Sequence, residues 1–142
     1  MSEEKNRILN CFAEAFMQDR MEFLSNFFAY PQPVFLRGEL QVFGAADTFI
    51  EALRLYRAAA MEIGTVTLRP RIVADGLTVR GYGSVWVEWD HLDADGTCLR
   101  TNQVRYATYQ DAGALYPRIE MIDYTVTAFP EALNATQQVA IA

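Results

Sequence analysis

The stretch LTVRGYGSVWVEWDHLDADGTCLRTNQVRYATYQ, from Leu77 to Gln110, predicts two long β-strands joined by a tight turn. β-Branched and aromatic residues alternate with polar residues in both halves, which is typical of strands with two different faces. The dipeptide Asp95-Gly96 between the halves is a strong hairpin signal, because both residues tolerate the left-handed backbone of such turns. We therefore expect an antiparallel pair in which Gly81 and Gly83 permit a bend.

The same strand pattern continues on both sides of this pair. The segment TVTLRPRIVA (65–74) is joined to the pair by Asp75-Gly76, a second hairpin signal, and RIEMIDYTVTAF (118–129) follows further turn residues. Four long strands are thus expected to run antiparallel in sequence order. Earlier in the chain, PVFLRGELQVFG (33–44) predicts two short strands that join near Gly38 and Glu39.

Three amphipathic helices precede the long strands. Apolar residues recur at helical spacing over 3–19, over a shorter segment from Met21 that must end before Pro31, and over AADTFIEALRLYRAAAMEIG (45–64), where Gly64 is a suitable C-terminal cap. The predicted class is α+β, with a curved mixed or antiparallel sheet of four long meander strands and two short strands wrapped around three helices. Residues 1–130 are expected to form one domain, and 131–142 a C-terminal tail.

Composition excludes several kinds of partner. The chain has 142 residues, 51% of them hydrophobic, so it can bury a core without disulfides or structural metal. A net charge of -6 opposes binding to nucleic acid. Cys11, Cys98 and the single His91 have no metal-ligand spacing, so no metal or cofactor is expected. No signal peptide and no apolar run of membrane-spanning length are seen, so we expect a cytoplasmic protein without a membrane partner.

The order of elements, together with three segments, resembles the nuclear transport factor 2-like superfamily, also called SnoaL-like. The segments are FFAYP (27–31), FGAADTFIEALRLYR (43–57), and the pair VRYATY (104–109) and RIEMIDYTV (118–126). The resemblance implies a cone-shaped α+β barrel with a pocket at its open end, and a homodimer formed through the sheet. It carries no signature of a particular chemistry.

Pairing the strands through their turns predicts which side chains share a face. One face is apolar, with Val85, Val87, Trp89, Val104 and Tyr106. The other face is polar but rich in aromatic residues, and we expect it to line the pocket because so many aromatic side chains are unusual on a solvated sheet. The candidate ligand-binding residues are Tyr82, Trp86, Glu88, Arg105, Tyr109, Glu120 and Tyr124. Phe12, Phe16, Phe35, Leu53 and Tyr56 are candidates for the pocket floor.

The chemistry of known superfamily members is only partly available in this chain. The resemblance implies that isomerase-like members keep a general base, an oxyanion donor and a second acid at positions held here by Leu36, Phe12 and Arg105, none of which can do that work. Arg105 with Glu88 and either Glu120 or Asp123 resembles the water-activating group of the limonene-epoxide-hydrolase-like branch. A structural ion pair between Glu88 and Arg105 is the stronger interpretation. His91 is expected to face solvent at a strand end.

Two functions from different classes follow. The first is a small-molecule-binding domain with an apolar, aromatic-lined pocket for a hydrophobic ligand, with an isomerase or hydrolase-type activity left open and no catalytic residue assigned. The second is a non-catalytic association module that forms a homodimer through the sheet face bearing Tyr82, Trp86 and Tyr109. A cavity that reaches Arg105 and Glu88 favours the first, and a sheet face covered by a second copy favours the second.

Overall fold

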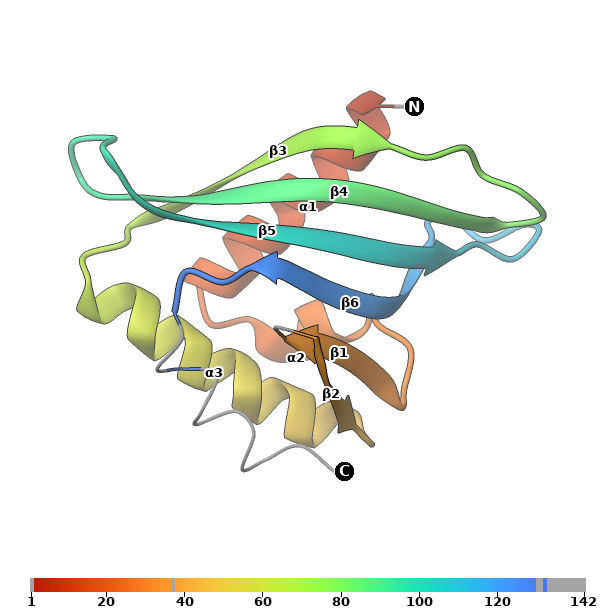
Figure 1. Cartoon of the computed structure of the whole chain (residues 1–142), viewed down its shortest axis with the longest axis horizontal. Helices are drawn as coiled ribbons and strands as arrows, with labels where there is room; N and C mark the ends of the chain where they lie inside the picture. The colour runs from red at the N-terminus through yellow and green to blue at the C-terminus, as the bar shows by residue number, and fades with distance from the viewer. Residues whose placement is uncertain (1, 37, 130–131, 133–142) are drawn as a thin grey trace.

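Three helices pack along one side of the molecule in the computed structural model, which describes residues 2–36, 38–129 and 132 (Figure 1). They are α1 (Ser2–Met17), α2 (Met21–Ser25) and α3 (Ala46–Glu62), as the apolar periodicity predicts. Helix α3 ends on Gly64, whose φ of 101° allows the Gly64 N–H to bond Met61 and the Thr65 N–H to bond Ala60. The predicted cap at Gly64 is confirmed.

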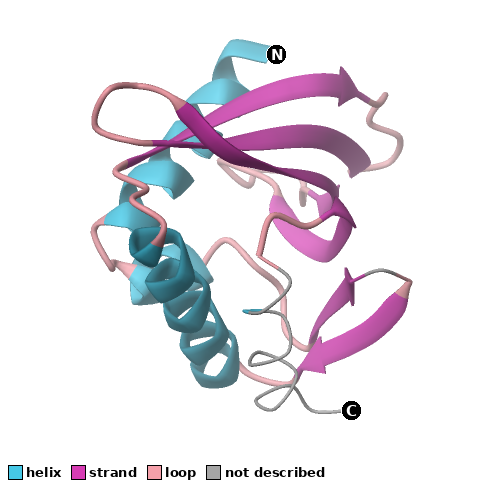
Figure 2. Cartoon of the chain, turned by 60° about the vertical axis from the view of Figure 1, so that its left-hand side comes forward, coloured by secondary structure: helices cyan, strands magenta, loops and turns pink. Residues whose placement is uncertain are grey.

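Six strands form one open, curved sheet that faces these helices (Figure 2). The strands are β1 (Gln32–Leu36), β2 (Glu39–Phe43), β3 (Thr67–Asp75), β4 (Tyr82–Leu92), β5 (Cys98–Tyr109) and β6 (Arg118–Val126). Their order is β2-β1-β6-β5-β4-β3, and every neighbouring pair is antiparallel except β1 with β6. Strand β3, which contains Pro70, is one edge of the sheet. The predicted mixed sheet with its antiparallel meander is confirmed.

The two predicted hairpin turns have different outcomes. The turn at Asp95-Gly96 forms as expected, with Gly96 at φ 80° and the Asp93 carboxylate accepting the N–H groups of Asp95 and Thr97, both at 2.9 Å. The turn expected at Asp75-Gly76 is instead made by the dipeptide 80–81. Strand pairing persists past Gly76, whose N–H donates to the Ser84 carbonyl at 2.9 Å.

Residues Arg80 and Gly81 make that second turn. Both have positive φ, 54° and 86°, and Val79 and Tyr82 exchange two backbone hydrogen bonds of 2.8 and 3.0 Å around them. This is the geometry of the mirror-image turn that matches strand twist, and it needs positive φ at both central residues. The Asp-Gly signal is therefore wrong at 75–76, because a better turn lies five residues further along the chain.

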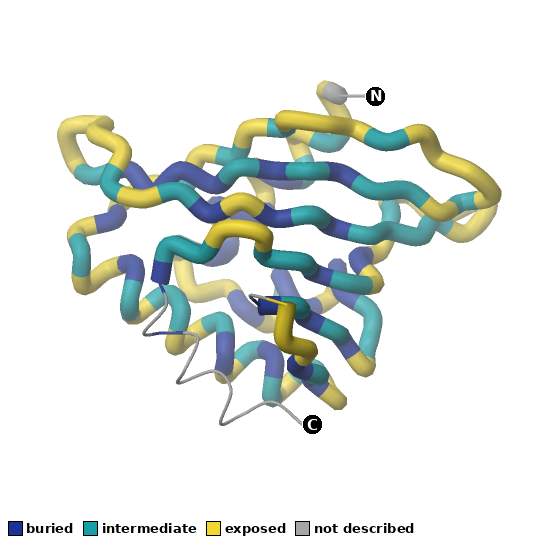
Figure 3. The backbone as a smooth tube through the Cα atoms, viewed as in Figure 1, coloured by how far each residue is buried: buried dark blue, intermediate teal, exposed yellow. Residues whose placement is uncertain are grey.

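The register of β4 with β5 confirms the predicted grouping of side chains into faces. Trp86 lies opposite Arg105, and the only break in pairing between these strands falls between His91 and Leu92. Buried and less buried residues consequently alternate along both strands (Figure 3). The prediction of which face turns inward is wrong. The apolar face is the buried one, with Val87 and Val104 each only 1% exposed.

The core lies between this apolar face and the three helices. It includes Phe12 and Phe16 of α1, Phe49 of α3, and Phe129 and Ala132 after the last strand. The predicted tail of residues 131–142 lies, apart from Ala132, outside the described residues. No described helix is long and apolar enough to cross a membrane.

The turn at Gly81 gives a test of the fold. A Cβ added at Gly81 would lie 2.7 Å from the Gln110 carbonyl oxygen, whereas one added at Gly96 would meet no atom within 4 Å. Both glycines have similar positive φ, so alanine at either should cost about 1–2 kcal/mol of unfolding free energy. We expect Gly81→Ala to cost about 1–3 kcal/mol more than Gly96→Ala, because of the added backbone clash. Urea unfolding measures both, and equal losses would contradict the turn geometry.

Candidate functional site

A cavity of about 110 Å³ lies between the inner face of the sheet and the helices. One part of its wall is aromatic and comes from all layers of the fold: Phe12 and Phe16 on α1, Phe28 after α2, Phe43 on β2, Phe49 on α3 and Trp89 on β4. The rings of Phe28 and Phe49 hold this wall together at a centroid distance of 4.8 Å. The wall is apolar and aromatic, so it favours a ring-shaped apolar group.

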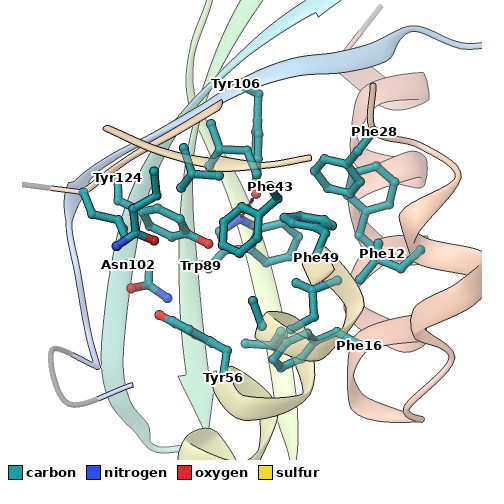
Figure 4. A pocket seen from close by; sticks show the side chains of 18 of the residues that line it. Phe12, Phe16, Phe28, Phe43, Phe49, Tyr56, Trp89, Asn102, Tyr106 and Tyr124 are labelled. Atoms are coloured by element: carbon teal, nitrogen blue, oxygen red, sulfur yellow. Dashed lines mark hydrogen bonds between the residues drawn. The ribbon is translucent and has the colours of Figure 1, made fainter. Parts of the chain in front are cut away.

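The polar part of the wall contains Gln41, Tyr56, His91, Asn102, Tyr106 and Tyr124. Figure 4 shows Tyr56, Asn102 and Tyr124 gathered at one end of the cavity, away from Phe12 and Phe28, with the Phe16 ring in edge contact with Tyr56. Tyr56 and Tyr124 are stacked with a ring-centroid distance of 6.4 Å. No Asp, Glu, Lys or Arg lines the cavity within the described part of the chain.

The tyrosine hydroxyls at this end stay protonated at neutral pH. Burial raises the pKa of Tyr124 to about 12, and burial also raises the pKa values of Tyr56 and Tyr106 well above their usual range. The Tyr106 hydroxyl accepts a hydrogen bond of 2.9 Å from the indole N–H of Trp89. These groups offer neutral hydroxyl donors and acceptors, and none supplies a charge.

His91 is buried beside the cavity, with only 1% of its surface exposed. Its Nδ1 lies 3.3 Å from the Thr65 hydroxyl and its Nε2 lies 3.5 Å from the Asn102 amide nitrogen. Burial, reinforced by the nearby Arg100 cation, lowers the pKa of His91 to about 4, so the ring is neutral at pH 7. The expectation that His91 faces solvent is wrong. It occupies an inward position on β4, in phase with Trp89.

Two polar groups in the cavity wall have no hydrogen-bond partner among the described residues. The Gln41 side chain is buried with 6% exposure, and both its amide oxygen and its amide nitrogen are unpaired. The Tyr56 hydroxyl is also unpaired. Asn102 lies beside Tyr56, but its oxygen accepts the Ala128 N–H at 2.6 Å and its nitrogen is directed at His91. Unpaired buried polar groups are rare enough to call for an explanation.

Of the seven predicted ligand-binding residues, only Tyr124 lines the cavity. The others lie on the outer face of the sheet or at its end: Tyr82, Trp86, Glu88, Arg105, Tyr109 and Glu120. These residues share a face as expected, and a simple energetic reason explains why that face turns outward. Turning the apolar face inward removes more apolar surface from water, while the polar face satisfies its charges across the strands and in solvent.

The outer face brings two pairs of these predicted residues together. The rings of Tyr82 and Tyr109 lie 4.6 Å apart, and the Arg105 guanidinium lies 5.9 Å from the Trp86 ring. Glu120 is exposed on β6.

The expected ion pair between Glu88 and Arg105 does not form. Glu88 instead pairs with Arg71 at 2.9 Å and accepts a hydrogen bond from Gln103 at 2.7 Å. Arg105 makes a long contact of 3.9 Å with Asp123. The epoxide-hydrolase-like grouping of Arg105 with acids therefore lies outside the cavity.

A second charged cluster on the same face has a structural role. The buried Asp90 carboxylate accepts hydrogen bonds from Arg69 and Arg71 on β3, at 2.7–3.2 Å, and from the Thr101 hydroxyl at 2.8 Å. The Arg71 guanidinium holds the pKa of Asp90 well below its usual range. This network ties β3 to β4 and β5 at the outer face, and its charges are directed away from the cavity.

Four of the five residues expected on the pocket floor do line the cavity: Phe12, Phe16, Leu53 and Tyr56. Phe35 does not. Gln41 was not expected, although the sequence contains a signal for it. It alternates with Phe43 on a short strand, so an inward Phe43 places Gln41 inward as well.

The comparison with solved structures shows the fold. No family model matches the chain, and no curated protein matches it. An NTF-2-like protein of unknown function from Shewanella oneidensis superposes with a TM-score of 0.65 at 13% identity, covering 87% of this chain and 97% of its own. A ketosteroid isomerase-like protein from Erwinia carotovora atroseptica gives 0.55 at 13% identity, covering 87% and 94%.

A putative calcium/calmodulin-dependent protein kinase II association domain from Xanthomonas campestris gives 0.61 at 9% identity, covering 92% and 89%. The chain therefore has the NTF2-like, or SnoaL-like, α+β fold, and the resemblance first seen in the sequence is confirmed at the level of fold. The positions matched to the isomerase chemistry hold Leu36 and Phe12 in the cavity wall and Arg105 outside it. None of the three supplies a base there.

Burial of neutral His91 gives a pH-dependent stability. The folded pKa of about 4 lies below the usual 6.5, so the unfolded chain binds the proton first as the pH falls. The contribution of His91 is complete above pH 6.5 and is lost between that value and about 4. We expect a loss of about 2 kcal/mol of unfolding free energy from pH 7 to 5.

The measurement is urea unfolding of the wild-type chain and of His91→Gln at both pH values. The variant lacks the titrating ring, so its stability should change far less over this window. Asp90, whose pKa is lowered, loses its contribution only at more acidic pH. The same slope in both proteins would contradict a buried, neutral His91.

Proposed function

We propose that this domain binds a small, uncharged, largely apolar molecule in the cavity. The observation that carries the proposal is the lining itself: nine aromatic side chains, from helices and strands, face a space of about 110 Å³ with no charged side chain among the described residues that line it. An engineered apolar cavity of about 150 Å³ binds benzene, so this somewhat smaller space is on the scale of one small ring and no more. Of the seven ligand-binding residues expected from the sequence, Tyr124 is the one we carry into this site.

The electrostatics of the site support a neutral ligand. A carboxylate moved from water into this cavity would lose its hydration without gaining a cation, because Arg105 lies on the outer face. The neutral His91 ring gives no compensating charge at pH 7. An anionic ligand is therefore less well supported than an uncharged ring compound.

Binding is the function that the geometry supports. The isomerase-type reactions need a general base within reach of the substrate, and the described lining contains no carboxylate. Both His91 nitrogens face protein groups, Thr65 and Asn102. The proposal therefore assigns no catalytic residue.

A cavity-filling variant tests the proposal. Ala52 on α3 is 6% exposed and lines the cavity, so Ala52→Leu should occupy part of the space that a ligand needs. We expect benzene, toluene or phenol at ten times its dissociation constant to stabilise the wild type by about 1.4 kcal/mol. The same compounds should have little effect on Ala52→Leu, as measured by thermal unfolding.

Ala107→Leu is the matched control, because Ala107 lies on the outer face between Ser84 and Met121. It should bind like the wild type. Benzoate serves as the charged comparator and should not stabilise any of the three proteins. Absence of binding by every neutral ring, or equal binding by Ala52→Leu and wild type, would overturn the proposal.

A second candidate function is association of two copies through the outer sheet face. The exposed Tyr82, 60% accessible, packs on Tyr109 at one end of that face, and Val126 is 48% accessible on β6. The two functions are compatible, because they use opposite faces of the sheet.

Sedimentation velocity tests this association. We expect the wild-type chain to sediment increasingly as a dimer at micromolar concentrations, and Tyr82→Glu to shift toward monomer because a carboxylate would be buried at the contact. Glu39→Gln, on β2 at the far edge of the sheet, is the control and should behave as wild type. A wild-type chain that remains monomeric at every concentration would exclude the association.

A further inference from the structure

The unpaired carboxamide of Gln41 carries a more specific conclusion about the ligand. Gln41 lies on β2 opposite Val34, which in turn lies opposite Ile122, and all three line the cavity. Its side chain is buried with 6% exposure, yet neither polar atom has a partner among the residues that the structure describes. Because both atoms are unpaired, the conclusion holds whichever way round the amide is placed.

Leaving these atoms unpaired is costly to the folded state. A buried donor or acceptor without a partner costs about 1–3 kcal/mol of stability, and leucine at this position would avoid the cost. The neighbouring inward positions are apolar: Phe43 on the same strand, Val34 across the ladder and Ile122 beyond it. The amide in this apolar wall is explained if a molecule that enters the cavity forms hydrogen bonds with it.

Tyr56 provides a second group of the same kind. Its hydroxyl has no hydrogen-bond partner in the described part of the chain and belongs to the same cavity of about 110 Å³. Both groups line one cavity whose volume is on the scale of a single ring, so one ring compound is the ligand that we expect to reach both. Gln41 offers one acceptor and two N–H donors, and Tyr56 offers one O–H donor and an acceptor.

We propose that Gln41 and Tyr56 select a neutral ring compound with a hydroxyl group, of the phenol class, over a hydrocarbon of the same size. A ligand hydroxyl can donate one hydrogen bond and accept another. It can donate to the Gln41 oxygen and accept from the Tyr56 O–H, or donate to the Tyr56 oxygen and accept from a Gln41 N–H. The apolar ring lies against the aromatic wall. This inference rests on the proposed function, since it requires that the cavity binds a ring at all.

The test compares phenol with toluene, which differ by a hydroxyl in place of a methyl group. The quantity measured is the ratio of the toluene to the phenol dissociation constant, obtained by titration calorimetry on the full chain. In the wild type, phenol should bind at least as tightly as toluene. Gln41→Leu should lower the ratio about 5- to 100-fold, because the phenol hydroxyl then loses its partner, while toluene binding is kept.

Further variants separate recognition from a structural role. Tyr56→Phe removes only the hydroxyl and should lower the ratio in the same direction. Gln103→Leu, on the exposed outer face where Gln103 bonds Glu88, is the matched control and should leave the ratio unchanged.

Ligand-free Gln41→Leu should unfold at a higher temperature than wild type, whereas a glutamine needed for the fold would give a lower unfolding temperature when it is replaced. Gln41→Met is the second variant if leucine packs poorly.

The outcomes distinguish this inference from the proposed function. Toluene binding with an unchanged ratio in Gln41→Leu and Gln41→Met overturns the selection by Gln41 and leaves the proposed function standing. Strong preference of the wild type for toluene over phenol also overturns the selection. Water alone would then satisfy the Gln41 amide. Failure of both probes to bind the wild type overturns the proposed function and this inference together.

Discussion

The register between β4 and β5 is the constraint on which the rest of this structure depends. Side chains alternate strictly along paired strands, so one choice of register assigns Trp89, Val104 and Tyr106 to the inner face and Trp86 and Arg105 to the outer face. A shift of a single residue would exchange these sets. The turn at Arg80-Gly81 and the Asp93–Thr97 loop hold that register from both ends. The contents of the cavity follow from it.

Local patterns predicted the fold well and the site poorly, for an identifiable reason. Helical periodicity, the Gly64 cap and the strand alternation are local, and each formed as expected. Which sheet face turns inward is decided by all the elements together. The aromatic residues Tyr82, Trp86 and Tyr109 appeared too numerous for an exposed face, yet they are accommodated by pairing with each other and with Arg105.

Individual polar residues were the hardest to place from the sequence. His91 follows a charged residue near a turn, which is typical of a solvated strand end, but it is buried because it is in phase with Trp89. Gln41 is buried for the same reason, because it is in phase with the inward Phe43 on a short strand. For both residues, the alternation of side chains along the strand decides which way the side chain faces, whatever its polarity. Asp90 lies between the inward-facing Trp89 and His91, so its carboxylate is on the outer face, where it pairs with two arginines.

Pro70 has a consequence for how this sheet meets other chains. It lies in β3, an edge strand, flanked by Arg69 and Arg71, which are about half exposed. Proline has no N–H to offer to an incoming strand, and charged side chains on an edge strand disfavour pairing with a second edge. The sheet is thereby protected from growing by strand addition at this side, which guards a protein with so apolar an interior against aggregation.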